Sequence, residues 1–138
     1  KIALFASDSA ALSKSTTAYA APSSATAVPT STHEVSTKTT DGGATNTGYT
    51  SGGVALTATA DPVLSGDTAC VKFNDVSITS ATFTARGCLV YNSTNITGFT
   101  NDRSVFAINF GSDKTVTSGT FTIQFPAQTA GNAIVQIA

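Results

Sequence analysis

Hydrophobic and polar residues alternate through the second half of the chain at the spacing of β-strands. The clearest case is Thr120–Phe125, in which Phe121, Ile123 and Phe125 are separated by single polar residues. Successive side chains of a strand point to opposite faces, so these three share one face. Pro126 follows and is expected to end the strand. The pattern therefore predicts a half-buried strand here.

Several further segments show a strand pattern and are punctuated by Gly, Pro, Asn or Asp. The predicted strands are Ile2–Phe5 as an edge strand, Val54–Thr59, Thr68–Phe73, Ala81–Tyr91, Arg103–Phe110 and Asn132–Ala138. A turn is predicted at 65–67, a bulge or close backbone approach at Gly87, and an end of strand at Gly111. No helical pattern separates the strands, which disfavours parallel pairing. The expected fold class is all-β, an antiparallel β-sandwich of the immunoglobulin-like or jelly-roll type.

The first third of the chain gives weaker signals. Residues 7–14 are compatible with one helical turn. Residues 15–53 are rich in Thr, Ser, Ala and Gly and read as a long N-terminal arm or loop. A structureless loop of that length is unusual inside a compact domain, so a neighbouring subunit is one hypothesis for what orders it. We expect a single domain, 1–138, with the N-terminal strand and arm in 1–53 and the sandwich core in 54–138.

Composition narrows the function classes. The chain holds 25 Thr, 16 Ser, 21 Ala and 11 Gly, more than half of its 138 residues, against seven Lys or Arg and eight Asp or Glu. Scattered charges with a net charge of −1 disfavour a nucleic-acid partner and a basic membrane-binding patch. Abundant β-branched residues and low net charge also disfavour disorder. No apolar run is long enough to span a membrane, and the chain as given carries no export signal.

Residues that could carry chemistry are few. Cys70 and Cys88 are far enough apart for a bridge between neighbouring strands, but two buried free thiols are the favoured reading. The single histidine, His33, lies in the arm and is expected to be an exposed loop residue. There is a single glutamate, Glu34, and no pair of aspartates has a spacing that suggests glycosidase carboxylates on facing strands. We therefore predict no catalytic, cofactor-binding or metal-binding residues, no cofactor and no enzymatic activity.

For the glycine-rich segments and the charged residues, the sequence favours structural roles over binding or catalysis. Residues 41–43 and 48–53 lack the Gly-Lys-Ser/Thr ending of a phosphate loop and read as turns. Arg86 lies inside an apolar strand. It is either a buried or interfacial arginine that pairs with a carboxylate of another strand or subunit, or an outward-facing strand residue, which is the favoured reading. The adjacent opposite charges at 102–103 and 113–114 are expected to decorate the ends of strands.

An ordered series of short motifs resembles a group of small virion structural proteins of tailed bacteriophages. The matching segments are Ile2–Phe5, Glu34–Ser36, Gly48–Gly53, Thr84–Asn92, Val105–Lys114, Gly119–Pro126 and Ala133–Ala138. They follow the order of the family and extend over most of the chain. In that family the Glu-Val-Ser unit runs almost directly into Gly-Tyr-Thr. Residues 37–47 therefore look like an insertion, and 20–32 look extended.

The resemblance implies a virion component, assembled in the cytoplasm of the bacterial host. The leading expectation is a capsid decoration (cement) protein on the outer surface of the head. Its expected partners are the major capsid protein or other virion proteins and further copies of itself, as a homo-oligomer (trimer or dimer). Neither nucleic acid nor membrane is an expected partner. The alternatives are a head-fibre, neck or tail protein, or an adhesive carbohydrate-binding domain.

Overall fold

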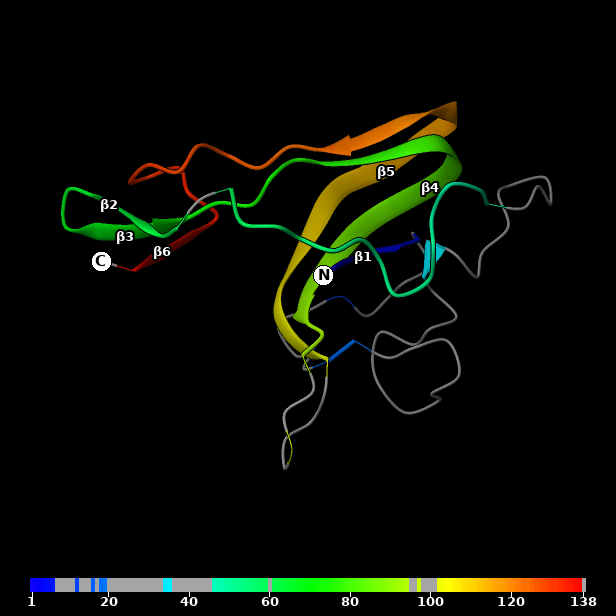
Figure 1. The fold of residues 1–138 in the computed structure, drawn as a ribbon. Helices are drawn as coiled ribbons and strands as arrows, with labels where there is room; N and C mark the ends of the chain where they lie inside the picture. The colour runs from blue at the N-terminus through cyan, green and yellow to red at the C-terminus, as the bar shows by residue number, and fades with distance from the viewer. Residues whose placement is uncertain are drawn as a thin grey trace. The chain divides into compact units, whose positions relative to one another are not determined.

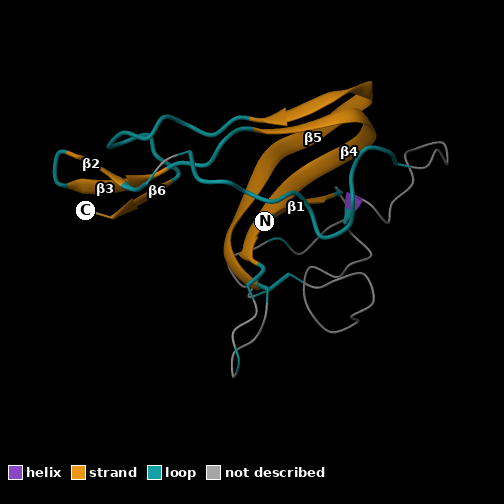
Figure 2. Cartoon of the chain, in the orientation of Figure 1, coloured by secondary structure: helices purple, strands orange, loops and turns teal. Residues whose placement is uncertain are grey.

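The fold is that of a computed structural model, drawn in Figure 1. The residues described are 1–6, 12, 16, 18–19, 34–35, 46–59, 61–94, 97 and 102–137. They contain six strands, which are shown in orange in Figure 2: β1 (Ile2–Phe5), β2 (Val63–Ser65), β3 (Thr68–Val71), β4 (Val76–Asn92), β5 (Arg103–Ile123) and β6 (Val135–Ile137). These form two antiparallel three-stranded sheets, β1-β4-β5 and β2-β3-β6. The prediction of an all-β antiparallel fold is confirmed.

The chain divides into two compact units. Unit 1 comprises Lys1–Ala55 and Ile78–Thr120, and unit 2 comprises Leu56–Ser77 and Phe121–Ala138. The units do not follow chain order, because the N-terminal third shares a unit with most of β4 and β5. A single domain with a boundary at 53/54 stays a prediction. The predicted helical turn at 7–14 and the exposed position of His33 lie outside the described residues, apart from residue 12.

The core of unit 1 forms around β1, whose four residues are all buried. β1 pairs with β4 in antiparallel register, Ile2 opposite Val90 and Phe5 opposite Gly87. One face of β1 packs into a hydrophobic cluster, to which Leu12 adds a partly buried side chain. The cluster consists of Ala3, Phe5, Tyr19, Leu89 and Tyr91. Burial of both faces explains why all four residues of β1 are apolar.

Unit 2 contains the smaller sheet. β2 and β3 form a hairpin through Gly66, whose φ of +64° suits the tight turn, and β3 pairs on its other side with β6. The turn predicted at 65–67 is confirmed. Phe73 packs edge to face against Phe125, with ring centroids 5.7 Å apart. The side-chain amide of Gln128 donates to the Cys70 carbonyl at 3.0 Å. This hydrogen bond holds the loop between β5 and β6 against β3.

Some predicted strand limits are wrong. Gly111 does not end its strand. β5 is 21 residues long in total and contains both the predicted strand Arg103–Phe110 and the first part of the predicted strand Thr120–Phe125. Gly111 has a φ of +77°, and its N–H donates to the Asn109 side chain at 2.8 Å, so glycine accommodates an irregularity inside the strand. The predicted strand at 54–59 is also absent. These residues contribute only isolated bridges at Val54 and Ala58, and most of them are half-buried or exposed.

Gly87 confirms the predicted close approach of two backbones. A Cβ atom at this position would lie 2.6 Å from the Ile108 carbonyl oxygen on β5. Such a distance is far inside van der Waals contact, so β4 and β5 can approach here only because the residue is glycine. β4 and β5 run side by side as the long pair of strands in Figure 1.

Candidate functional site

A buried glutamate is the principal polar feature of unit 1. Glu34 is fully buried and forms an isolated antiparallel bridge with Phe5 of β1. Its Oε1 accepts from the Tyr49 hydroxyl at 2.7 Å and from the Gly52 N–H at 2.9 Å. Its Oε2 accepts from the Tyr19 hydroxyl at 2.9 Å and the Ser51 hydroxyl at 3.0 Å. Four donors on two oxygens satisfy a buried carboxylate.

The tyrosine hydroxyls carry this network to β1 and β4. The Leu4 N–H donates to the Tyr49 hydroxyl at 2.9 Å, so the hydroxyl proton of Tyr49 is directed at Glu34. The Tyr91 hydroxyl donates to the Gly52 carbonyl at 2.6 Å. The Tyr91 ring stacks on Tyr19, with centroids 4.5 Å apart. We call Tyr19, Glu34, Tyr49, Ser51, Gly52 and Tyr91 the Glu34 cluster.

Ionisation of the tyrosines is suppressed in this environment. Burial, the largest cause, raises the pKa of Tyr19 and of Tyr49 well above the ordinary value, and the adjacent Glu34 carboxyl adds to both rises. Burial likewise raises the pKa of Tyr91 to about 12, with smaller contributions from Asp102 and Glu34. The three hydroxyls therefore act as hydrogen-bonding groups near neutral pH rather than as bases.

The glycine-rich loop at 48–53 has an unexpected role. It is a turn, as predicted, with Gly48, Gly52 and Gly53 at positive φ. A Cβ on Gly53 would collide with the Ile2 backbone, so this glycine permits the loop to lie against β1. The loop also binds an anion through the Gly52 N–H, and that anion is the protein's own Glu34 carboxylate.

Glu34 is not among the site residues expected from the sequence, although the composition carries one signal for it. The chain has a single glutamate and three tyrosines, and all four meet in this cluster. The hypothesis that a neighbouring subunit orders the 15–53 segment is not needed at these positions. Tyr19, Glu34, Val35 and Tyr49 are buried within their own chain.

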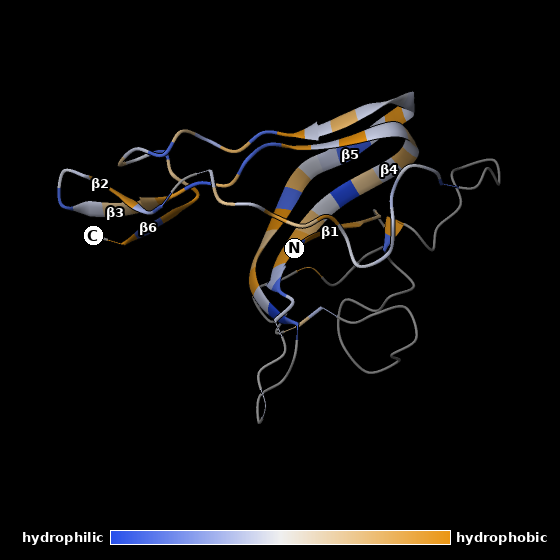
Figure 3. Ribbon diagram, in the orientation of Figure 1, coloured by the Kyte–Doolittle hydropathy of each residue, from blue (hydrophilic) through white to orange (hydrophobic). Residues whose placement is uncertain are grey.

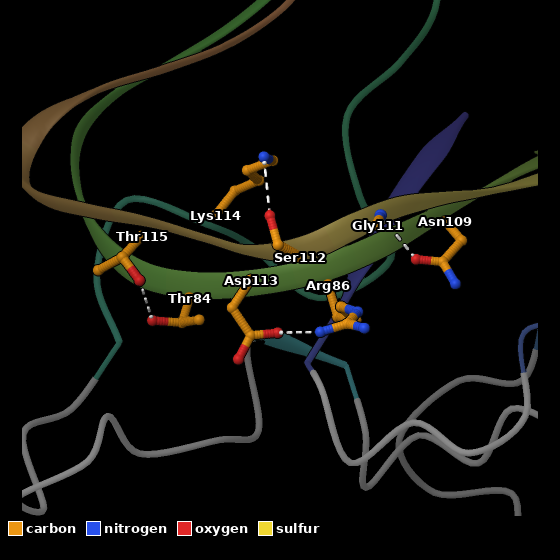
Figure 4. A network of polar contacts seen from close by, with 8 residues as sticks. All are labelled: Thr84, Arg86, Asn109, Gly111, Ser112, Asp113, Lys114 and Thr115. Carbon is orange, nitrogen blue, oxygen red and sulfur yellow. Dashed lines mark hydrogen bonds and ion pairs between the residues drawn. The ribbon is translucent and has the colours of Figure 1, made fainter.

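A second polar network lies on the exposed side of β4 and β5 (Figure 4). Arg86 Nη1 donates to Asp113 Oδ1 at 3.3 Å, and the two side chains are 41% and 43% exposed. The hydroxyls of Thr84 and Thr115 hydrogen-bond across the same pair of strands at 2.9 Å. The outward-facing reading of Arg86 is confirmed, and the arginine also pairs with a carboxylate of the neighbouring strand, but it is not buried. An exposed pair of this kind contributes about 0–1 kcal/mol to stability.

Of the two charged pairs predicted to lie at strand ends, the pair at 113–114 lies inside β5. Asp113 and Lys114 are both within this strand, and they do not pair with each other. Asp113 faces Arg86, whereas Lys114 Nζ donates to the Ser112 hydroxyl at 3.0 Å. Further along, the Ser118 N–H donates to the Thr82 hydroxyl at 2.9 Å. On the side of β4 and β5 that carries Arg86 and Asp113, the other described side-chain contacts are thus made by the hydroxyls of Thr82, Thr84 and Thr115.

A cavity of about 430 Å³ opens beside the first half of β5 in unit 1. Its lining side chains are uncharged: Leu12, Thr16, Ser104, Val105, Phe106, Ala107 and Asn109. The volume is in the range of small-ligand sites. Its lining offers contact surface, hydroxyls and an amide, but no group that titrates near neutral pH.

Both cysteines lie in the interior of the described part of the chain. Cys70 and Cys88 are free and buried, which confirms the favoured reading. Burial raises the pKa of the Cys88 thiol to about 12. Within the described ranges, no three His, Cys, Asp or Glu side chains gather closely enough to hold a metal ion. No helix of the described part of the chain is long and apolar enough to cross a membrane.

Comparison with family models, with curated proteins and with solved structures finds no match for this chain. The described fold therefore defines only a broad class. The protein is an all-β protein with two antiparallel sheets, and one of its two units contains a buried glutamate–tyrosine cluster.

Proposed function

We propose that this protein is a structural component of a bacteriophage virion, specifically a capsid decoration (cement) protein that binds the outer surface of the head. The observation that carries the proposal is the exposed β4–β5 face of unit 1. Its described side-chain contacts are made by Thr82, Thr84 and Thr115, with a single exposed ion pair between Arg86 and Asp113. The resemblance to phage virion proteins supports the same assignment.

This face suits assembly because it combines rigidity with little charge. Hydroxyl pairs across strands hold the surface in place, and neutral side chains are less costly to desolvate than charges. Its uncharged hydroxyls can still donate and accept hydrogen bonds at the rim of a protein contact. Weak contacts of this type become sufficient when many copies bind one particle.

The Glu34 cluster supports a structural role from inside unit 1. The carboxylate of Glu34 accepts four hydrogen bonds from its own chain, so it stiffens the scaffold. The proposal assigns the protein no catalytic activity and no cofactor. The finer fold assignment, an immunoglobulin-like or jelly-roll sandwich with a long N-terminal arm, belongs to the same proposal, as do the host-cytoplasm site of assembly and the homo-oligomeric state.

The placement of the tyrosines does not favour the alternative of a carbohydrate-binding domain. Sugar sites commonly stack pyranose rings on exposed aromatic side chains, and the chain has no Trp. Its three tyrosines, Tyr19, Tyr49 and Tyr91, are at most 9% exposed. The rings of the tyrosines are therefore buried and do not form an exposed surface on which a sugar could stack.

The proposal is tested by locating the protein in whole particles by cryo-electron microscopy. Hundreds of copies on the head surface are expected, whereas about six or twelve would place it in a neck or tail ring and replace the decoration assignment. Absence from the particle would overturn the virion assignment as well.

A binding experiment tests the β4–β5 face. Purified protein is added to heads that lack it, and bound protein is measured by co-sedimentation. Thr115→Lys places a charge on the proposed contact face and is expected to reduce occupancy at least about tenfold. Thr57→Lys makes the same change on an exposed residue of unit 2 and serves as the control. Equal occupancy for Thr115→Lys and the control would exclude this face as the contact.

A further inference from the structure

The cavity beside the first half of β5 in unit 1 is long and narrow. Its lining residues follow one another along the strand from Ser104 to Ala107, and Asn109 comes two residues further on. A strand rises about 3.3 Å per residue, so this wall is roughly 16 Å long. A volume of about 430 Å³ along such a wall forms a groove. Leu12 and Thr16 line it from another part of the chain, and we call these seven residues the β5 groove.

The middle of the β5 groove is apolar. Val105, Phe106 and Ala107 form this part of the wall, and Figure 3 shows hydrophobic colour along the first half of β5. Val105 is the one large hydrophobic side chain that the described part of unit 1 leaves exposed, at 59%. Ligand sites are concave and lined mainly by hydrophobic side chains, with a few polar groups that fix the orientation of the ligand. The middle of the groove therefore suits apolar groups of a ligand.

Polar groups lie towards the two ends of the β5 groove, and none of them is charged. At one end the Ser104 hydroxyl donates to the Thr16 carbonyl, so the hydroxyl oxygen can accept a further hydrogen bond. At the other end Asn109 Oδ1 accepts from the Gly111 N–H at 2.8 Å. This contact directs the NH₂ group of Asn109 away from Gly111 (Figure 4). The groove therefore offers an acceptor and a donor on either side of an apolar centre.

An extended backbone already contacts the chain where the β5 groove begins. Ala18 forms an isolated antiparallel bridge with Arg103, and the Tyr19 N–H donates to the Asp102 carbonyl at 2.8 Å. The β5 groove starts at the residue after Arg103. A peptide that lies in the groove would therefore continue, along β5, the strand-like contact that Ala18 makes at its start.

We propose that the β5 groove binds an extended, uncharged peptide segment of a partner protein, about five residues long. Apolar side chains of the peptide pack on Val105, Phe106 and Ala107, and its main-chain N–H and C=O groups pair with the polar groups at the two ends. A fatty acid or a nucleotide fits less well, because the groove has no charged group to pair with its anion. The inference is independent of the proposed function, because it concerns peptide binding by the isolated chain.

Titration of the full chain with a capped pentapeptide tests the proposal. The probe is Ac-Thr-Val-Thr-Val-Thr-NH₂, which is uncharged and alternates apolar and hydroxyl side chains. We expect saturable shifts of the ¹H–¹⁵N NMR signals of residues 104–109, including the side-chain NH₂ of Asn109. Peptides with Asp in place of both Val, or with Pro in place of the central Thr, should bind at least about tenfold more weakly. The absence of saturable shifts at 104–109, or equal binding of all three peptides, would overturn the proposal.

Variants at exposed positions distinguish the β5 groove from an adhesive surface. Val105→Thr removes apolar contact and should weaken binding of the pentapeptide at least about threefold, whereas the matched change Val63→Thr on β2 should leave binding unchanged. Ala107→Phe makes the surface more apolar but fills the groove, so binding should weaken at least about tenfold. Unchanged or tighter binding in Ala107→Phe would refute the groove. A single capped residue, Ac-Val-NHCH₃, that binds as tightly as the pentapeptide would refute the extended segment.

Discussion

Replacing Glu34 tests whether the buried cluster holds the N-terminal third of the chain in place. In Glu34→Ala, the hydroxyls of Tyr49 and Tyr19 lose their acceptor in a buried site. Each unsatisfied buried donor costs about 1–3 kcal/mol, and the missing side chain leaves a cavity besides. We expect a loss of about 3–6 kcal/mol, a large part of the free energy of unfolding of a typical domain.

Glu34→Gln separates the loss of charge from the loss of the acceptor. The amide oxygen can still accept from Tyr49 and Gly52, and the amide NH₂ can donate to the hydroxyls of Tyr19 and Ser51. Hydrogen bonds to a charged group are stronger than neutral ones, so a loss of about 1–2 kcal/mol is expected. The predicted order of stability is therefore wild type, then Glu34→Gln, then Glu34→Ala.

Urea denaturation followed by intrinsic tyrosine fluorescence measures both variants. The chain has no Trp, and its three tyrosines all lie in the Glu34 cluster, so the signal reports on this part of unit 1. The control is Asp67→Asn, an exposed residue of the β2–β3 turn, which should change stability by less than about 0.5 kcal/mol. Glu34→Ala unfolding at the same urea concentration as this control would refute the reasoning.

Two further predictions concern close packing and ionisation. Gly87→Ala forces a Cβ against the Ile108 carbonyl and should cost about 1–3 kcal/mol or more in thermal denaturation. Gly66→Ala, which has open space but a φ of +64°, should cost only about 1–2 kcal/mol, and a larger loss than in Gly87→Ala would contradict the steric argument. Because the pKa of Tyr91 is raised to about 12, stability should be intact below pH 10 and fall as pH rises from 10 towards 12, where the unfolded chain ionises first. Spectrophotometric titration of tyrosinate should coincide with unfolding, and ionisation near pH 10 in the folded protein would contradict it.

The presence of a strand could be predicted where hydrophobic and polar residues alternate strongly. The first and last residues of the strands could not be predicted. The run from Phe121 to Ile123 and the turn at Gly66 follow from local patterning and glycine chemistry. β2 was missed because it has only three residues, too few for a period to show. The continuity of β5 through Gly111 was missed because a glycine that usually ends a strand can also relieve an irregularity within a paired one.

The Glu34 cluster could not be predicted because it depends on contacts between distant residues. Glu34 meets Tyr19, Tyr49 and Ser51 across separations of 15 or 17 residues, and no local periodicity connects them. A glutamate in a segment rich in Ser and Thr looks solvent-exposed by composition. What decides its position is that four donors converge on it, and that information exists only in the folded chain.

Two deletions follow from this placement and differ sharply in outcome. Residues 15–53 are the segment expected from the sequence to be an arm. Their removal takes away Glu34 together with Tyr19 and Tyr49, which donate hydrogen bonds to it, so unit 1 is expected to unfold.

Removal of 37–45, inside the segment that looks like an insertion, keeps the Glu34 cluster. The side chain of Asn46 donates to the Val35 carbonyl at 2.6 Å, so the two ends already lie close together. Closing a shorter loop costs less entropy, and stability should fall by less than about 1 kcal/mol or rise. Circular dichroism and urea midpoints measure both variants. A folded 15–53 deletion, or an unfolded 37–45 deletion, would show that the Glu34 cluster does not hold this part of the chain.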